Sequence, residues 1–169
     1  DALTGLGIKT WPDGRHYEGG FVNGLESGEG IHTWSTGDKY VGEYLNGMKH
    51  GKGVYTWPDG AIYTGSYKYD KTDGAGRLTL ANGENYEGMY KGGMRNGYGV
   101  GTYANGEQYK GEYLNGLKHG TGEYISLNGT VHSGQYRNGT ANGKGQIIFI
   151  DGSIFEGVFE NGNLSESYV

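Results

Sequence analysis

The chain has 169 residues, a formal net charge of −5 and no cysteine. The acidic balance argues against nucleic acid as a partner, because phosphates call for a basic surface, and it argues equally against purely electrostatic membrane binding. The absence of cysteine excludes disulfide bonds and thiol chemistry. No apolar run approaches the roughly 20 residues that a membrane-spanning helix needs.

Glycine and aromatic residues dominate what remains. Glycine numbers 37 and proline only 2, beside 16 tyrosines, 4 phenylalanines and 3 tryptophans. Glycine-rich linkers are flexible and lack aromatic residues and any period. This sequence has both, which indicates an ordered structure.

A repeat of 23 residues organises the sequence, and a fixed period of this size is typical of a repeat architecture. No insertion or deletion separates the copies, which begin at Tyr17, Tyr40, Tyr63, Tyr86, Tyr109, His132 and Phe155. We expect a single array over residues 1–169: a half repeat at 5–16, full repeats at 17–39, 40–62, 63–85, 86–108, 109–131 and 132–154, and a half repeat at 155–164.

The first part of each repeat predicts a strand and a tight turn. Counting repeat positions from the first aromatic residue, aromatic residues at positions 1 and 5 flank an unvarying glycine at position 3. This alternation is a strand signal. Asn-Gly follows in most copies, as at Asn46-Gly47, and favours a two-residue hairpin turn because both residues tolerate positive φ.

The second part predicts the returning strand. Positions 12 and 14 are glycine in every full repeat, and the run ends in a three-residue turn such as Pro58-Asp59-Gly60. Each repeat is therefore expected to form one β-hairpin, and chaining them gives an all-β antiparallel meander of about 14 strands. The cross-strand register stays open, since a turn at positions 7–8 or 8–9 preserves the same facing.

The two sides of the expected sheet differ. Positions 1, 5, 16 and 18 place aromatic residues on the same side as the glycines, whereas the other side is mixed polar, with residues such as Glu43 and Lys52. Rings lying over bare backbone would give a single sheet a thin aromatic core and leave that side partly open.

The pattern YxGxYxNGxxxGxGxxxWPDG resembles the MORN (membrane occupation and recognition nexus) repeat family over residues 5–164. The resemblance implies an elongated, twisted, single-layer antiparallel sheet with an aromatic-lined groove. It also implies a role in holding proteins together, or near membranes and cytoskeletal structures. Two departures, Tyr69-Asp70-Lys71 in the third copy and His132 in the sixth, leave the local turn shape and groove chemistry open there.

Residues that could carry chemistry do not form a recognisable catalytic or metal-binding set. His50 and His119 hold the same position three repeats apart and cannot share a metal ion. Glu26 and Glu29 are expected to be solvated strand and turn residues, and the Gly-x-Gly runs lack the following helix that a phosphate loop needs. We therefore expect no enzyme activity, no cofactor and no metal.

The uncovered aromatic side is the feature that predicts a function, because a long apolar strip usually marks an interaction surface. We expect a non-enzymatic scaffold that binds a helical or extended segment of a partner protein at a cytoskeletal or membrane-associated structure in the cytoplasm. The expected partner-binding residues are Tyr17, Phe21, Trp34, Tyr40, Tyr44, Trp57, Tyr63, Tyr67, Tyr86, Tyr90, Tyr103, Tyr109 and Tyr113. The amino-terminal half should anchor more strongly, since position 18 is tryptophan only at Trp11, Trp34 and Trp57.

Two alternatives remain. A phosphoinositide- or membrane-associated module would use a sparse basic edge formed by Lys49-His50, Arg95 and Lys118-His119. A self-assembling rod, or a homodimer through the sheet ends, would use the open edge strands of the meander.

Overall fold

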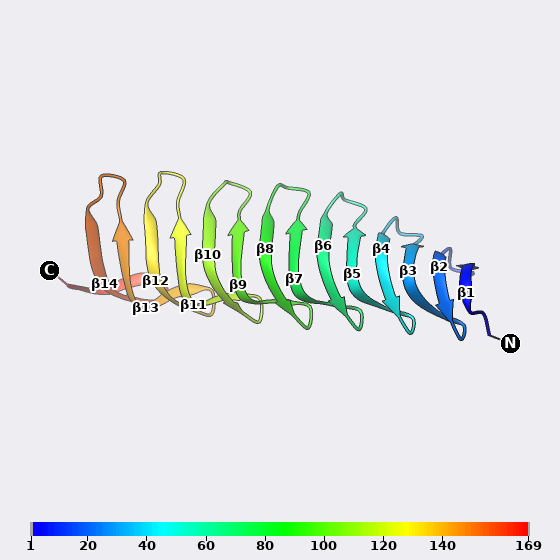
Figure 1. Cartoon of the computed structure of the whole chain (residues 1–169). Coiled ribbons are helices and arrows are strands. Elements are labelled where there is room, and N and C mark those ends of the chain that lie inside the picture. Colours follow the sequence, from blue (N-terminus) through cyan, green and yellow to red (C-terminus); the bar gives the residue numbers. More distant parts are fainter. Residues whose placement is uncertain (1, 169) are drawn as a thin grey trace. The chain divides into compact units, whose positions relative to one another are not determined.

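The computed structural model describes residues 2–168, in which every regular element is a β-strand and none is a helix. The strands are β1 (Gly5–Thr10), β2 (His16–Val22), β3 (Leu25–Thr33), β4 (Lys39–Leu45), β5 (Met48–Thr56), β6 (Ile62–Lys68), β7 (Lys71–Thr79), β8 (Asn85–Lys91), β9 (Met94–Thr102), β10 (Gln108–Leu114), β11 (Leu117–Ile125), β12 (Val131–Arg137), β13 (Thr140–Ile148), β14 (Ile154–Glu160) and β15 (Asn163–Tyr168). They form one open sheet in chain order, each strand hydrogen-bonded to the next (Figure 1).

The all-β antiparallel meander expected from the sequence is thus confirmed. It has 15 strands rather than about 14, because β15 extends beyond the last half repeat.

The chain divides into two compact units. Unit 1 consists of the residues up to Ala81 together with Tyr90–Gly93, and unit 2 consists of Asn82–Met89 together with the residues from Met94 onward.

Turn chemistry decides the register. The two-residue turns lie at repeat positions 7–8: Leu45 pairs with Met48, and Asn46 and Gly47 between them have φ of 51° and 80°. In the third copy Tyr69 and Asp70 also have positive φ, 48° and 68°. The local shape of the turn therefore survives the departure from Asn-Gly, although the left-handed region is unfavourable for tyrosine.

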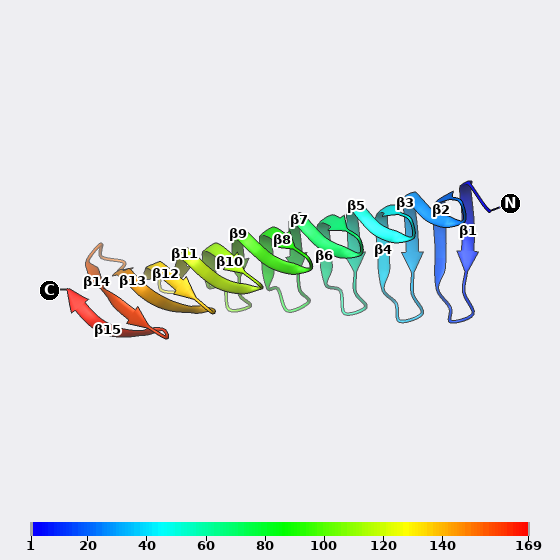
Figure 2. The same ribbon diagram turned by 90° about the horizontal axis from the view of Figure 1, so that it is seen from below.

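In every full repeat whose two strands lie in the same unit, the hairpin contains a β-bulge, which bends it. In β4 and β5, for example, Gly42 pairs with Gly53 and Tyr44 pairs with Lys49, so the register shifts between them. The position-12 glycine, here Gly51, has φ of 70° and takes up the extra length. The strands accordingly bend near their two-residue turns (Figures 1 and 2).

A tyrosine ring lies across the straight part of each of the first five full repeats. A methyl group on Gly53 would collide with the Tyr40 ring, and one on Gly42 would collide with the Gly53 backbone. The Tyr40 hydroxyl donates to the carbonyl oxygen of Glu43 at 3.0 Å, within the bulge. The hydroxyls of Tyr17, Tyr63, Tyr86 and Tyr109 make the same bond at 3.0–3.1 Å. We call this arrangement the tyrosine–glycine lock.

The position-5 rings join one lock to the next. In unit 1, Tyr44 meets Tyr40 and Tyr17 edge to face, with ring centroids 5.2 and 5.1 Å apart. Tyr67 meets Tyr40 in the same way at 5.2 Å. In unit 2, Tyr113 meets Tyr86 and Tyr109 at 5.1 and 5.2 Å. Residues 2–168 form a single layer of sheet, and these aromatic pairs form its core; we call them the tyrosine ladder.

His132 replaces the tyrosine in the sixth copy and changes the lock without breaking the ladder. Its Nδ1 lies 2.7 Å from the Tyr136 hydroxyl, and its ring meets Phe159 edge to face at 4.5 Å. The imidazole therefore keeps the ring contacts but gives up the hydrogen bond to the bulge carbonyl.

Two polar residues belong to the core of unit 1. Glu26 is 7 % exposed and accepts a hydrogen bond from Lys9 Nζ at 3.0 Å, so the expectation that Glu26 is solvated was wrong. A buried carboxylate needs a charged partner, which Lys9 supplies from the neighbouring hairpin. His32 is also 7 % exposed and stacks between Trp11 and Trp34, with centroid distances of 5.2 and 4.1 Å.

The lock can be tested with two substitutions and a control. Tyr40→Phe removes the hydrogen bond to Glu43 and should lower the free energy of unfolding by about 1 kcal/mol. Gly53→Ala forces the Tyr40 ring aside and should cost about 3 kcal/mol. Val54→Ala, on the opposite side of the sheet and 36 % exposed, should cost less than either. Urea unfolding followed by circular dichroism gives the comparison, and equal midpoints for Gly53→Ala and Val54→Ala would contradict the lock.

Burial of His32 predicts a pH-dependent stability. Burial, and secondarily the charge of Arg15, holds the His32 pKa below its ordinary value of 6.5. The unfolded chain therefore binds the proton at higher pH than the folded chain, and stability falls as the pH drops below about 6.5. His32→Phe keeps the stacking and should reduce the loss of thermal stability between about pH 7.5 and 5.5. Part of the loss should remain, because burial also lowers the pKa of His132; an unchanged pH profile in His32→Phe would contradict the assignment.

Candidate functional site

Ten of the thirteen residues expected to bind a partner belong to the tyrosine ladder, which Phe21, Tyr63 and Tyr90 join through the edge-to-face contacts Tyr17–Phe21, Tyr63–Tyr67 and Tyr63–Tyr90. None of them is more than 7 % exposed: Tyr17, Phe21, Tyr40, Tyr44, Tyr63, Tyr67, Tyr86, Tyr90, Tyr109 and Tyr113. The remaining three, Trp34, Trp57 and Tyr103, are partly exposed. A direct role in binding stays a prediction for all thirteen, and the burial indicates that the ten act first as core.

In unit 1 the partly exposed rings form one row. Trp11, His32, Trp34, Tyr55 and Trp57 follow one another, and we call them the tryptophan row. Trp34 and Tyr55 have centroids 5.7 Å apart, and Tyr55 and Trp57 have centroids 4.6 Å apart. His32 continues the row by stacking between Trp11 and Trp34, with interplanar angles of 13° and 6°.

The end of each hairpin positions this row. Trp57 follows β5 directly, and its N–H donates to the Ala61 carbonyl at 2.9 Å across the three-residue turn. Trp34 makes the corresponding bond to Asp38 at 3.0 Å. Tyr55, two residues before Trp57, points to the same side as Trp57. In the strand pairing, Tyr55 lies opposite Tyr40 on β4 and opposite Tyr63 on β6. Alternation along a strand therefore brings positions 16 and 18 to one side.

A lysine lies among these rings. Lys49 Nζ is 4.9 Å from the ring centroid of Tyr55, 5.8 Å from that of Trp34, and 5.7 Å from those of Tyr40 and Tyr67. Burial lowers the Lys49 pKa, and the nearby carboxylates of Asp70 and Asp38 oppose the shift. The charge is thus stabilised by ring faces more than by a direct ion pair.

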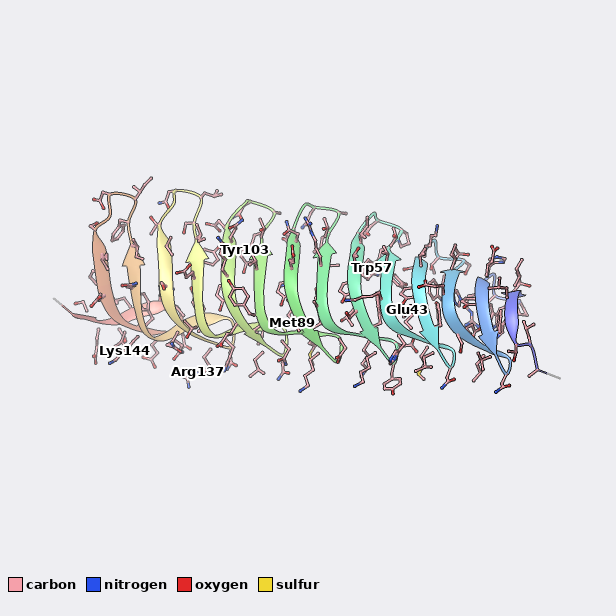
Figure 3. All side chains as sticks on the ribbon, in the orientation of Figure 1. Glu43, Trp57, Met89, Tyr103, Arg137 and Lys144 are labelled. Atoms are coloured by element: carbon pink, nitrogen blue, oxygen red, sulfur yellow. The ribbon has the colours of Figure 1, made fainter. Side chains whose placement is uncertain are left out.

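Unit 2 repeats part of this arrangement. Lys118 Nζ lies 4.7 Å from the Tyr124 centroid, 5.3 Å from that of Tyr109 and 5.4 Å from that of Tyr103. Tyr103 and Tyr124 have centroids 5.9 Å apart, and the Tyr124 hydroxyl donates to Glu107 at 2.6 Å. Burial and this carboxylate raise the Tyr124 pKa to about 12. Tyr103 follows β9 as Trp57 follows β5 (Figure 3).

The sequence analysis left out His32, Tyr55 and Tyr124 as partner-binding candidates, and treated Lys49 and Lys118 only as part of a basic edge. The three rings hold position 16, whose period-two relation to position 18 could have found them. The two lysines hold position 10, which faces the position-5 ring only when the turn lies at positions 7–8. The register was therefore the missing information.

The opposite side of unit 1 is less polar than expected. An open hollow of about 530 Å³ is lined by Leu6, Ile8, Ile31 and Val41, among others. All four side chains are exposed, Leu6 at 87 % and Val41 at 39 %. They form an apolar patch beside the glycine pairs of β1 to β4.

Within residues 2–168 no group of three or more His, Cys, Asp or Glu side chains could hold a metal ion. In the same residues no helix has the length and apolar character needed to cross a bilayer.

Solved structures with a similar fold include domains of CPAP proteins. The SAS-4 (dCPAP) TCP domain of Drosophila melanogaster, solved with a proline-rich motif of Ana2 (dSTIL), is 14 % identical with a TM-score of 0.55, covering 91 % of this chain and 84 % of that one. The TCP10 domain of Danio rerio CPAP is 12 % identical with a TM-score of 0.51, covering 96 % and 81 %. The G-box domain of the microcephaly protein CPAP is 13 % identical with a TM-score of 0.50, covering 98 % and 99 %. At these identities the likeness concerns the fold alone.

No curated protein matches the sequence significantly. The family model described as MORN repeat does match, at residues 1–14, 17–39, 40–62, 63–84, 86–108, 109–131 and 132–154. These matches cover most of the sequence. Each full copy has both turn types described above, and each one except the copy that begins at His132 has the tyrosine–glycine lock. The chain belongs to the MORN repeat family.

Proposed function

We propose that this chain is a non-enzymatic scaffold that binds an extended segment of a partner protein across the tryptophan row of unit 1. The observation that carries the proposal is a row of five rings, four of them partly exposed, on a side of the sheet that no second layer within residues 2–168 covers. Tryptophan and tyrosine are the side chains that most often anchor protein interfaces, since they bury a large apolar area with few rotatable bonds.

An extended, proline-rich segment is the first candidate for the occupant. Proline-rich chains adopt the polyproline II conformation before binding, and they dock into aromatic-lined sites at low entropic cost. A domain of similar fold has been solved with a proline-rich motif. A helical segment is the second form that the same rings could accept.

The location proposed for this scaffold is the cytoplasm, at a cytoskeletal structure. The support is the fold shared with CPAP domains, one of which is described as suggesting a role in centriole elongation. Membrane association through the basic residues, and homodimers through the sheet ends, remain alternatives. The basic side chains of the expected edge lie over aromatic rings, as Lys49 does over Tyr55, instead of projecting into solvent toward a membrane.

Removing two rings should weaken binding more than changing the polar side. We expect Trp34→Ala with Trp57→Ala to weaken the binding of fluorescent proline-rich peptides by about 2 kcal/mol, roughly thirtyfold in Kd, because both anchors lose their contact area. The matched control is Lys52→Ala, whose Nζ bonds Ser66 at 2.8 Å on the opposite side. Fluorescence anisotropy measures the affinities, and circular dichroism checks the fold.

Three results would decide against the proposal. Equal losses in the double variant and Lys52→Ala would remove the tryptophan row from the binding site. Tighter binding of amphipathic helical peptides than of proline-rich ones would replace the extended occupant. Binding only to vesicles that contain phosphoinositide would favour the membrane alternative.

A further inference from the structure

Unit 2 carries two cations on its aromatic side, and the sequence reading did not place them there. Arg95 and Lys118 hold repeat position 10 in adjacent copies. The Arg95 guanidinium lies 4.6 Å from the Tyr86 ring centroid and 5.9 Å from that of Tyr113. Lys118 is the cross-strand partner of Tyr113. The two cations therefore flank Tyr113, and both side chains are partly exposed.

Within the described part of the chain, neither cation has a carboxylate oxygen within ion-pair distance. Across residues 2–168, the ion pairs with nitrogen and oxygen within 4.0 Å are Lys9–Glu26 and Arg15–Asp13, both in unit 1. Hydrogen bonds from Tyr124 and Asn105 hold the Glu107 pKa below its ordinary value, and the charge of Lys118 contributes in the same direction. Glu107 is already engaged, since it accepts hydrogen bonds from Tyr124 at 2.6 Å and Asn105 at 2.9 Å.

The described residues of unit 1 include no such pair of cations at position 10 of adjacent copies. There, position 10 is Glu26, Lys49 and Thr72 in successive copies. Lys9 neutralises Glu26, and Asp70 and Asp38 both act on Lys49. Two adjacent unpaired positive charges on the aromatic side are therefore a property of unit 2.

The spacing of the two cations fits an extended chain. One repeat occupies two strands, or about 9.6 Å across the sheet. Three residues advance about 9.3 Å in polyproline II and complete one turn of that helix, so side chains at i and i+3 face the same side. A polyproline II segment that crosses the strands would therefore bring side chains at i and i+3 to Arg95 and Lys118 in turn.

We propose that the aromatic side of unit 2 recognises an acidic extended segment in which carboxylates three residues apart pair with Arg95 and Lys118. The inference rests on the proposed function and adds a charge and a spacing to the partner. Charge complementarity selects the acidic peptide, since carboxylates would supply the partners that this surface lacks. Tyr103 and Tyr124, which lie beside Lys118 and are partly exposed, supply apolar contact for the residues between the carboxylates. A membrane is the less suitable occupant, because the pair is only two charges in a chain of net charge −5.

The test uses labelled proline-rich peptides with a Glu-x-x-Glu pair. The comparison peptides carry Gln-x-x-Gln, adjacent Glu-Glu, or Lys-x-x-Lys in the same framework. We expect the wild-type chain to bind Glu-x-x-Glu about tenfold more tightly than Gln-x-x-Gln at low salt, as two partly exposed ion pairs would provide. Adjacent Glu-Glu should show less of this gain.

Two sets of variants identify the cations. Arg95→Glu with Lys118→Glu should abolish the acidic preference and favour Lys-x-x-Lys instead. Lys110→Glu with Lys144→Glu makes the same change of charge on the opposite side of unit 2 and should keep the acidic preference. Arg95→Gln with Lys118→Gln serves if the reversed pair fails to fold; it should bind Glu-x-x-Glu and Gln-x-x-Gln equally.

The outcomes separate this inference from the proposed function. Equal wild-type affinity for Glu-x-x-Glu and Gln-x-x-Gln, with binding still sensitive to Trp34→Ala and Trp57→Ala, would overturn the acidic preference alone. Failure of every peptide to bind would overturn both proposals. Phosphoinositide vesicles whose binding is lost in the Arg95 and Lys118 variants, without any acidic peptide preference, would assign the cations to a membrane.

Discussion

The contact between a tyrosine ring and two paired glycines holds together the hairpin of each of the first five full repeats. Tyr40 covers Gly42 and Gly53, where any larger side chain would collide with the ring or the opposite backbone. Its hydroxyl donates to the Glu43 carbonyl in the bulge that follows. The bulge bends the strand, the bend lets the ring lie flat, and the ring satisfies the bulge. The hydrogen bond and the ring contact therefore reinforce the bulge in these repeats.

This lock explains how one layer of sheet can carry both a core and a binding surface. The ladder tyrosines fill the bend and become buried, so they supply the apolar area that a second layer would otherwise provide. Residues farther along the hairpin, such as Tyr55 and Trp57, lie beyond the ladder and stay partly exposed. The position-10 side chains lie between these two sets of rings. There a lysine or arginine can keep its charge while its stem packs on aromatic carbon.

The copies that depart from the pattern show which parts of it are essential. His132 loses the bond to the bulge carbonyl but keeps ring contacts with Tyr136 and Phe159. Tyr69 and Asp70 keep the turn geometry without asparagine or glycine, and Asp70 accepts a hydrogen bond from the Lys49 N–H at 2.9 Å. Ring packing and turn shape are thus retained where individual hydrogen bonds are not.

The sequence by itself determined the repeat length, the hairpins, the positive-φ turns and the side of the sheet on which each aromatic residue lies. Those features follow from local chemistry: Asn-Gly and Pro-Asp-Gly favour particular turns, and alternation assigns the facing.

Only the tertiary structure decided which rings are buried. Tyr44 and Trp57 share a side in the sequence pattern, yet Tyr44 is 6 % exposed and Trp57 remains accessible. The reason is the bulge, which the glycine pattern permits but does not locate. The same shift in register brings Lys49 to Tyr44 and Lys118 to Tyr113, and it pairs Glu26 with Phe21. Which charged residues lie beside the aromatic rings therefore depends on cross-strand pairing. A register shift of one residue would change those pairs.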